Sequence, residues 1–199
     1  MNDIFQNIKS GFFATSIWEW LGVLTGVLYV VFISYKKIIA WLFALISSTI
    51  YVYLCFKSKL FIETGLQFFY VIMAIYGWFK WNSDQTDNHG IIIKWKPKFH
   101  LLNILISVLL VGLLGYIFDS YTNQENPYTD AFSTVFSLAA TFMVTKKVLE
   151  NWIYWIVIDA VCIYLFASRG LFLTSILFFF YTIIAVFGFV QWRREFKLQ

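Results

Sequence analysis

The sequence predicts an all-α membrane protein with seven transmembrane helices, arranged as two parallel three-helix repeats joined by a linker helix (3+1+3). Two observations lead to this prediction. Hydrophobic residues occupy 60% of the 199 positions and charged residues only 13%, and the mean hydropathy is +0.72. A chain of this composition cannot cover a soluble domain with polar surface, so its solvent is a lipid bilayer. The second observation is an internal repeat.

Residues 19–81 align with residues 130–192 without a gap, at a constant offset of 111 residues (192 − 81). Identical residues recur to the end of the alignment, among them the pairs Lys36 and Lys147, Trp41 and Trp152, Tyr53 and Tyr164, Tyr70 and Tyr181, Gly77 and Gly188, and Trp81 and Trp192. Both halves are almost wholly apolar. We therefore interpret the chain as a duplicated membrane protein, a class that usually builds its substrate site between the two units.

The first repeat, residues 17–81, contains apolar runs at residues 17–35, 38–56 and 60–79, separated by lysines. About 20 residues of helix cross the ~30 Å hydrocarbon core of a bilayer. Each run is therefore expected to be one transmembrane helix, since a strand edge in lipid would leave backbone groups unpaired. The very short break after the first run predicts a tight antiparallel hairpin.

The apolar run at residues 99–118 matches neither repeat and has the length of one crossing. Three crossings reverse the direction of the chain, so two directly fused three-helix units would be inverted relative to each other. One additional crossing restores the parallel relation. We therefore expect a linker helix here, within a connecting region of residues 82–127 that also holds a cytoplasmic loop and an outer loop.

The second repeat, residues 128–192, contains the last three expected helices, at residues 129–145, 149–167 and 170–190. The break after the first of them is again very short. Both prolines, Pro97 and Pro127, fall in connections, as continuous helices require. Cys55 and Cys162 lie in apolar runs at unmatched positions of the repeat, so we expect two separate thiols rather than a disulfide or a metal site, and no cofactor.

The distribution of charge predicts an N-terminus outside and a C-terminus in the cytoplasm. With that orientation the inner side receives eleven of the 15 basic residues: Lys36, Lys37, Lys80, Lys94, Lys96, Lys98, Lys146, Lys147, Arg193, Arg194 and Lys197. Positive residues gather on the cytoplasmic side of membrane proteins. The isoelectric point of about 9.0 therefore reflects orientation in a bilayer and does not indicate a nucleic-acid partner.

Three residues of the sixth expected helix, Trp152, Trp155 and Asp159, are the strongest local signal of a binding site. Steps of three and seven residues at ~100° each place them within about 60° of arc, so two indoles and a carboxylate form one stripe. An acid in mid-membrane costs roughly 2.5 to 3.5 kcal/mol, so Asp159 should face a polar cavity or a partner. Trp152 taken alone also fits an ordinary interfacial residue.

A comparison of the two repeats indicates which positions of this stripe are structural and which are functional. Trp41 occupies the position of Trp152 in the first half, whereas Ser48 stands where the second half has Asp159. Further candidate substrate-binding residues are Gln67, Tyr70 and Tyr181. Gln67 also fits a hydrogen bond between helices, and the two tyrosines fit core packing. A carboxylate among aromatic rings suits a flat cationic ring that carries hydroxyl groups.

The stripe W-x-x-W-x-x-x-D, preceded by Lys146, Glu150 and Asn151, resembles the PnuC family of bacterial vitamin transporters, as do the repeat endings YGWFKW and FGFVQW. The resemblance covers residues 18–194. It implies the seven-helix fold related to SWEET sugar transporters, and the inner membrane as location. It also implies Trp152, Trp155, Asp159 and Gln67 as site residues.

The same resemblance implies nicotinamide riboside as the usual substrate, moved by facilitated diffusion and trapped by a cytoplasmic vitamin kinase. It implies homo-oligomers as well, often trimers. Relatives of this fold carry thiamine or riboflavin, and the family accepts Asn or Asp where this chain has Asp159. Thiamine, another cationic heteroaromatic compound, is therefore the alternative substrate.

Two other classes of function compete with a transporter. An intramembrane enzyme would need catalytic groups, but the two histidines, His89 and His100, lie in or beside one connection, and neither H-E-x-x-H nor G-x-S-x-G occurs. We therefore expect no enzyme activity. A structural or channel-like protein would show ionic current instead of saturable binding. Because the helices carry no pair of acids suited to ion coupling, we expect passive transport.

Overall fold

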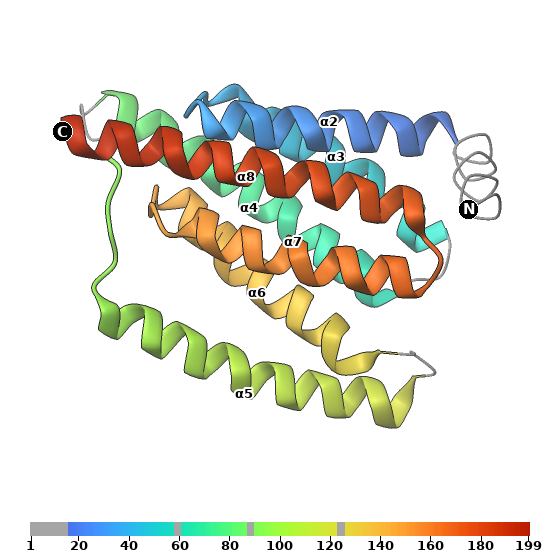
Figure 1. Cartoon of the computed structure of the whole chain (residues 1–199). Helices are drawn as coiled ribbons and strands as arrows, with labels where there is room; N and C mark the ends of the chain where they lie inside the picture. The colour runs from blue at the N-terminus through green and yellow to red at the C-terminus, as the bar shows by residue number, and fades with distance from the viewer. Residues whose placement is uncertain (1–15, 58–60, 87–89, 123–125) are drawn as a thin grey trace. The chain divides into compact units, whose positions relative to one another are not determined.

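The computed structural model describes residues 16–57, 61–86, 90–122 and 126–199. These residues form seven α-helices, shown with their labels in Figure 1: α2 (Ile17–Ser34), α3 (Ile39–Lys57), α4 (Phe61–Thr86), α5 (Pro97–Tyr121), α6 (Pro127–Thr145), α7 (Asn151–Ser168) and α8 (Phe172–Leu198). The expected all-helical fold is thus confirmed. By length and composition, five of the helices can cross a membrane, namely α2, α3, α5, α7 and α8.

Pro97 and Pro127, which were expected in connections, are instead the first residues of α5 and α6, a position that proline tolerates. The other helix ends follow the apolar runs to within about three residues, with two exceptions. Helix α4 continues to Thr86 and α8 to Leu198, whereas the sequence predicted ends at residues 79 and 190. The predicted helix ends coincide with the ends of the apolar runs. Charged and amide side chains such as Arg193 and Gln191 are compatible with a helical backbone, and no proline or glycine interrupts either extension, so each helix outlasts its apolar part.

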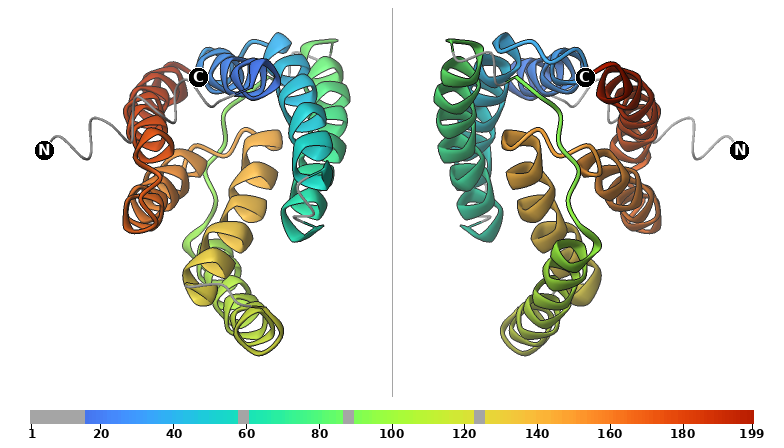
Figure 2. Two further views of the ribbon diagram at one scale, coloured as in Figure 1. Left: turned by 90° about the vertical axis from the view of Figure 1, so that its right-hand side faces the viewer. Right: turned by 90° about the vertical axis from the view of Figure 1, so that its left-hand side faces the viewer.

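The chain folds as two compact units. Unit 1 comprises residues 1–91 and 190–199, and unit 2 comprises residues 92–189. In unit 1, α3 packs against both α2 and α4. In unit 2, α6 packs against α5 and α7, and Figure 2 shows α5 and α6 side by side. Helix α8 begins in unit 2, and its last turns belong to unit 1.

The turns after α2 and α6 share one backbone geometry. Lys36 and Lys147 each have φ of 53°, which is rare for a residue other than glycine. Lys36 N donates to Ile33 O at 3.0 Å, and Lys147 N donates to Val144 O at 3.0 Å. The next residue in each turn donates to the carbonyl one position further back, which completes a Schellman-type helix end in both places. The aligned sequences therefore form the same local structure.

A tryptophan packed on a glycine forms part of the core of each unit. A Cβ atom added to Gly77 would lie 2.5 Å from the ring of Trp41, and one added to Gly188 would lie 2.7 Å from the ring of Trp152. Both tryptophans are 1% exposed. Since the two pairs occupy equivalent repeat positions, the second and third helices of each repeat meet through the same close contact.

Candidate functional site

Helix α7 carries the tryptophan and aspartate stripe into the interior of unit 2. Asp159 is buried, and Trp155 packs half-buried against a core cluster formed by Ala140, Ile158 and Cys162. Both side chains therefore point inward from α7, as the helical spacing predicts.

The carboxylate of Asp159 is the most unusual group in this stripe. Its residue is only 3% exposed, yet within the described part of the chain it accepts no hydrogen bond and forms no ion pair. A buried carboxylate without a partner is costly, and a hydrocarbon surrounding supplies no water to relieve that cost. Asp159 is therefore suited to receive a ligand that brings positive charge or hydrogen-bond donors.

Trp152 lies one turn closer to the start of α7 than Trp155 and is covered by α8. Its indole rests on the backbone at Gly188, where the nearest ring atoms leave no room for a methyl group. Tyr181 also belongs to α8. Its ring makes an edge contact with Phe178 at 5.8 Å between centroids, and Phe178 stacks on Phe166 at 5.2 Å. These aromatic contacts fix the face of α8 that packs on α7.

The four candidates of the first repeat lie in unit 1. Trp41 is fully buried, with its ring 5.5 Å from that of Trp81, and its indole N–H has no hydrogen-bond acceptor among the described residues. Ser48, in the same helix α3, is buried as well. Gln67 and Tyr70 are half-buried on α4, one turn apart. Of the four candidates in unit 1, two are thus buried and two half-buried.

A pocket of about 290 Å³ in unit 2 lies on a different face of α7. Its lining residues are Val111, Tyr128, Thr129, Phe132 and Val161, so it is bounded by α5, α6 and α7. Val161 follows Asp159 by two residues, which is a rotation of about 200° around the helix. This largely apolar pocket is therefore separate from the stripe.

One group of residues beside the stripe was not predicted as a unit. His100 Nδ1 lies 3.1 Å from the hydroxyl of Tyr154, the residue next to Trp155. His100 was expected in or beside a connection, at the start of the linker helix, and nothing in the sequence ties it to a residue more than 50 positions away. The neighbouring motif residues Glu150 and Asn151 were the available signal. Among the described residues, no cluster of His, Cys, Asp and Glu is arranged to hold a metal ion.

A solved structure with the same fold is described as the vitamin B3 transporter PnuC. The match has a TM-score of 0.72 and covers 98% of this chain and 90% of that one, at 22% sequence identity. The two chains therefore share one fold.

Residues 16–194 match the protein family described as "Nicotinamide mononucleotide transporter". The chain belongs to this family, which confirms the resemblance found in the sequence. It is 26% identical to the nicotinamide riboside transporter PnuC of Escherichia coli, over 93% of this chain and 88% of that protein. The PnuC of Neisseria mucosa is also 26% identical, over 98% and 80% of the two chains. The riboflavin/roseoflavin transporter RibM of Streptomyces davaonensis is 22% identical over 65% of this chain and 63% of RibM.

Proposed function

We propose that this protein takes up nicotinamide riboside across a membrane by facilitated diffusion. The observation that carries the proposal is the buried carboxylate of Asp159, which lacks a protein partner in the described part of the chain and lies on the indole-bearing helix of a transporter family member. The relatives in Escherichia coli and Neisseria mucosa are both nicotinamide riboside transporters by name, which supports the same substrate here.

The chemistry of the stripe fits this substrate. Nicotinamide riboside contains a positively charged aromatic ring and ribose hydroxyl groups. Asp159 supplies the counter-charge or accepts from the hydroxyls, and the face of Trp155 attracts the cationic ring by about 0.5 to 2 kcal/mol. Thiamine is the alternative, since it is also a cationic heteroaromatic compound. Riboflavin has no cationic ring, so Asp159 can accept from its hydroxyl groups but provides no counter-charge for its ring.

For the mechanism, we propose two parallel three-helix repeats, residues 17–81 and 128–192, that rock relative to each other, with α5 as the linker helix. The shared turn geometry at Lys36 and Lys147 and the equivalent Trp–Gly contacts support a common plan for the two repeats. Further substrate-binding residues in this proposal are Trp41, Ser48, Gln67 and Tyr70 of the first repeat, and Trp152 and Tyr181 of the second. No ion is coupled in this scheme, which matches the single carboxylate of the stripe.

The cellular setting follows from charge and family. We propose the bacterial inner membrane, with the N-terminus outside and the C-terminus in the cytoplasm, because eleven of the 15 basic residues then face the cytoplasm. A cytoplasmic kinase would phosphorylate the vitamin and prevent its return. A homo-oligomer, such as a trimer, is the expected assembly.

A binding titration of the purified protein tests the substrate directly. We expect saturable binding of nicotinamide riboside, weaker binding of thiamine, and little binding of riboflavin or nicotinamide mononucleotide, because the phosphate of the last would face Asp159. Tighter binding of thiamine than of nicotinamide riboside would transfer the proposal to thiamine. In proteoliposomes, uptake that stops when a protonophore is added or sodium is removed would refute uncoupled transport.

A further inference from the structure

The segment that leads into α5 is paired with the turn between α6 and α7. Ile93 N donates to Lys147 O at 3.0 Å, and Leu149 N donates to Ile93 O at 2.8 Å, which forms a parallel β-bridge between Ile93 and Val148. Val148 and Leu149 are fully buried. The linker helix is therefore attached, by backbone pairing just before its start, to the residues that precede the stripe helix.

Side chains extend this attachment on both sides of the bridge. Glu150 Oε2 accepts a hydrogen bond from Trp95 N at 3.3 Å and lies 3.7 Å from His100 Nε2. The other ring nitrogen of His100 lies 3.1 Å from the hydroxyl of Tyr154, and the rings of His100 and Trp95 are 5.6 Å apart. We call these four residues, Trp95, His100, Glu150 and Tyr154, the clasp.

The clasp makes contacts at the start of α7 through two residues that are one helical turn apart. Glu150 immediately precedes the first residue of α7, and Tyr154 lies four residues later, between the two tryptophans of the stripe. Two contacts one turn apart fix both the position of a helix along its axis and its rotation about it. We therefore expect the clasp to influence the direction in which Trp155 and Asp159 point.

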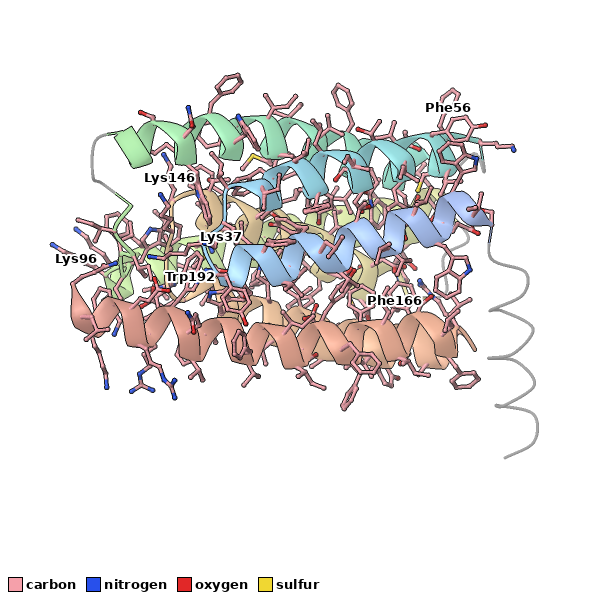
Figure 3. All side chains as sticks on the ribbon, turned by 90° about the horizontal axis from the view of Figure 1, so that it is seen from above. Lys37, Phe56, Lys96, Lys146, Phe166 and Trp192 are labelled. Carbon is pink, nitrogen blue, oxygen red and sulfur yellow. The ribbon has the colours of Figure 1, made fainter. Side chains whose placement is uncertain are left out.

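The first repeat has the same turn but no such arrangement of side chains. Glu150 aligns with Ile39, and Tyr154 aligns with Phe43. The first turn is held by other contacts: the Lys36 ammonium pairs with Glu195, and the indole of Trp192, labelled in Figure 3, donates to Ser34 O at 3.0 Å. The turn thus forms without a clasp, and among the described residues the clasp belongs to the repeat that carries the charged stripe.

We propose that Glu150 is a positioning residue for substrate binding, and that the clasp makes α5 and α7 move as one body during transport. This inference rests on the proposed binding of the vitamin by Trp155 and Asp159. Glu150 does not contact the substrate in this proposal. It acts by holding the segment of Ile93 and Trp95 against the start of α7, so an artificial link between the same two segments should replace it.

The test begins with substrate titrations of the purified full-length protein. Glu150→Ala removes the acceptor for Trp95 N and the contact to His100, and we expect the Kd for nicotinamide riboside to rise about tenfold, the loss of roughly one buried hydrogen bond. Glu150→Gln keeps an oxygen acceptor, so its Kd should rise less. Glu195→Gln is the matched control for Glu150→Gln, because Glu195 pairs with Lys36 in the turn of the first repeat. The Kd of this variant should stay at the wild-type value.

A disulfide then separates positioning from direct contact. The two residues of a β-bridge are close enough for a disulfide, so cysteines introduced by Ile93→Cys and Val148→Cys should form one. The background is a Cys55→Ala, Cys162→Ala protein, which must itself bind substrate like the wild type. With Glu150→Ala added, we expect the oxidised protein to recover a Kd within about twofold of wild type, and the same sample to lose that recovery on reduction. A residue that only stabilises the fold, or that touches the substrate, would give no redox-dependent recovery.

Several results would overturn the proposal. These are an unchanged Kd in the folded Glu150→Ala protein, a disulfide that does not form, a Kd that stays high after it forms, or loss of transport when it forms beside an intact Glu150. Asp159→Ala distinguishes this failure from that of the proposed function. If Asp159→Ala loses binding while Glu150→Ala keeps it, only the clasp proposal fails. If both variants bind normally, the stripe itself is not the site.

Discussion

Gly188→Ala tests whether the contact beneath Trp152 sets the geometry of the stripe. A methyl group at residue 188 would lie 2.7, 2.7 and 2.8 Å from three ring carbons of Trp152. Carbon atoms pack at about 3.5 Å or more, so the ring or α8 must move by about 0.8 Å. Because both are buried, this movement disturbs the core, and overpacking of this kind costs about 1 to 3 kcal/mol.

Two measurements follow from that displacement. The apparent melting temperature of the purified protein should fall by about 2 to 4 °C for each kcal/mol lost. The Kd for substrate should rise as well, because Trp152 moves together with the stripe. Gly112→Ala is the matched control on α5, where an added Cβ meets no atom within 4 Å. That variant should melt at or slightly above the wild-type temperature, since alanine favours a helix.

A double mutant identifies the cause. In Trp152→Phe the smaller ring leaves room for the methyl group of Gly188→Ala, so the two stability losses should not add. The coupling should be about 1 kcal/mol or more, as for residues in direct contact. A Gly188→Ala protein that melts like the wild type and binds with unchanged affinity would refute the reasoning. The indole of Trp152 could then move away from the added methyl group without loss of stability or affinity.

Three further predictions concern charges and backbone. Asp159→Ala should weaken substrate binding by at least ~1 kcal/mol, the loss of a charge-assisted contact, and unchanged affinity in the folded variant would exclude Asp159 from the site. Arg169 donates to both carboxylate oxygens of Asp130, at 3.0 and 2.6 Å, so a double-mutant cycle should give a coupling near 1 kcal/mol that added salt reduces. Lys36→Gly should be more stable than Lys36→Val by about 1 kcal/mol or more, because both lose the pair with Glu195 but only valine is strained at a φ of 53°. Equal stability would contradict the assigned backbone.

The helices could be predicted from sequence because hydrophobic length is a local property. The starts of α3 and α7 lie within about two residues of the expected positions, since lysines interrupt the apolar runs there. The far end of α8 could not be predicted from the same signal. Beyond residue 190 the helix leaves the apolar run, and hydropathy does not distinguish a polar helix from a polar loop.

The candidate site was predictable only in its local part. The spacing of Trp155 and Asp159 places them on one face of a helix, and both do face the interior of unit 2. The clasp could not be predicted, because Trp95 and Glu150 are 55 residues apart and their contact depends on how two connections pair. The spacing of hydrophobic residues shows which side of a single helix is buried, but it does not show which distant segments contact each other.

The repeat also suggests why the stripe carries an acid in one half and a hydroxyl in the other. Trp41 and Trp152 rest on equivalent glycines, so replacing either tryptophan would leave a large cavity, and packing alone keeps both. No such constraint acts on the position of Ser48 and Asp159, where either side chain can be buried. A second buried carboxylate would cost another ~2.5 to 3.5 kcal/mol, and a substrate with a single positive charge could neutralise only one. If Asp159 binds the substrate as proposed, a monovalent cation would therefore favour one aspartate and one hydroxyl at the two equivalent positions.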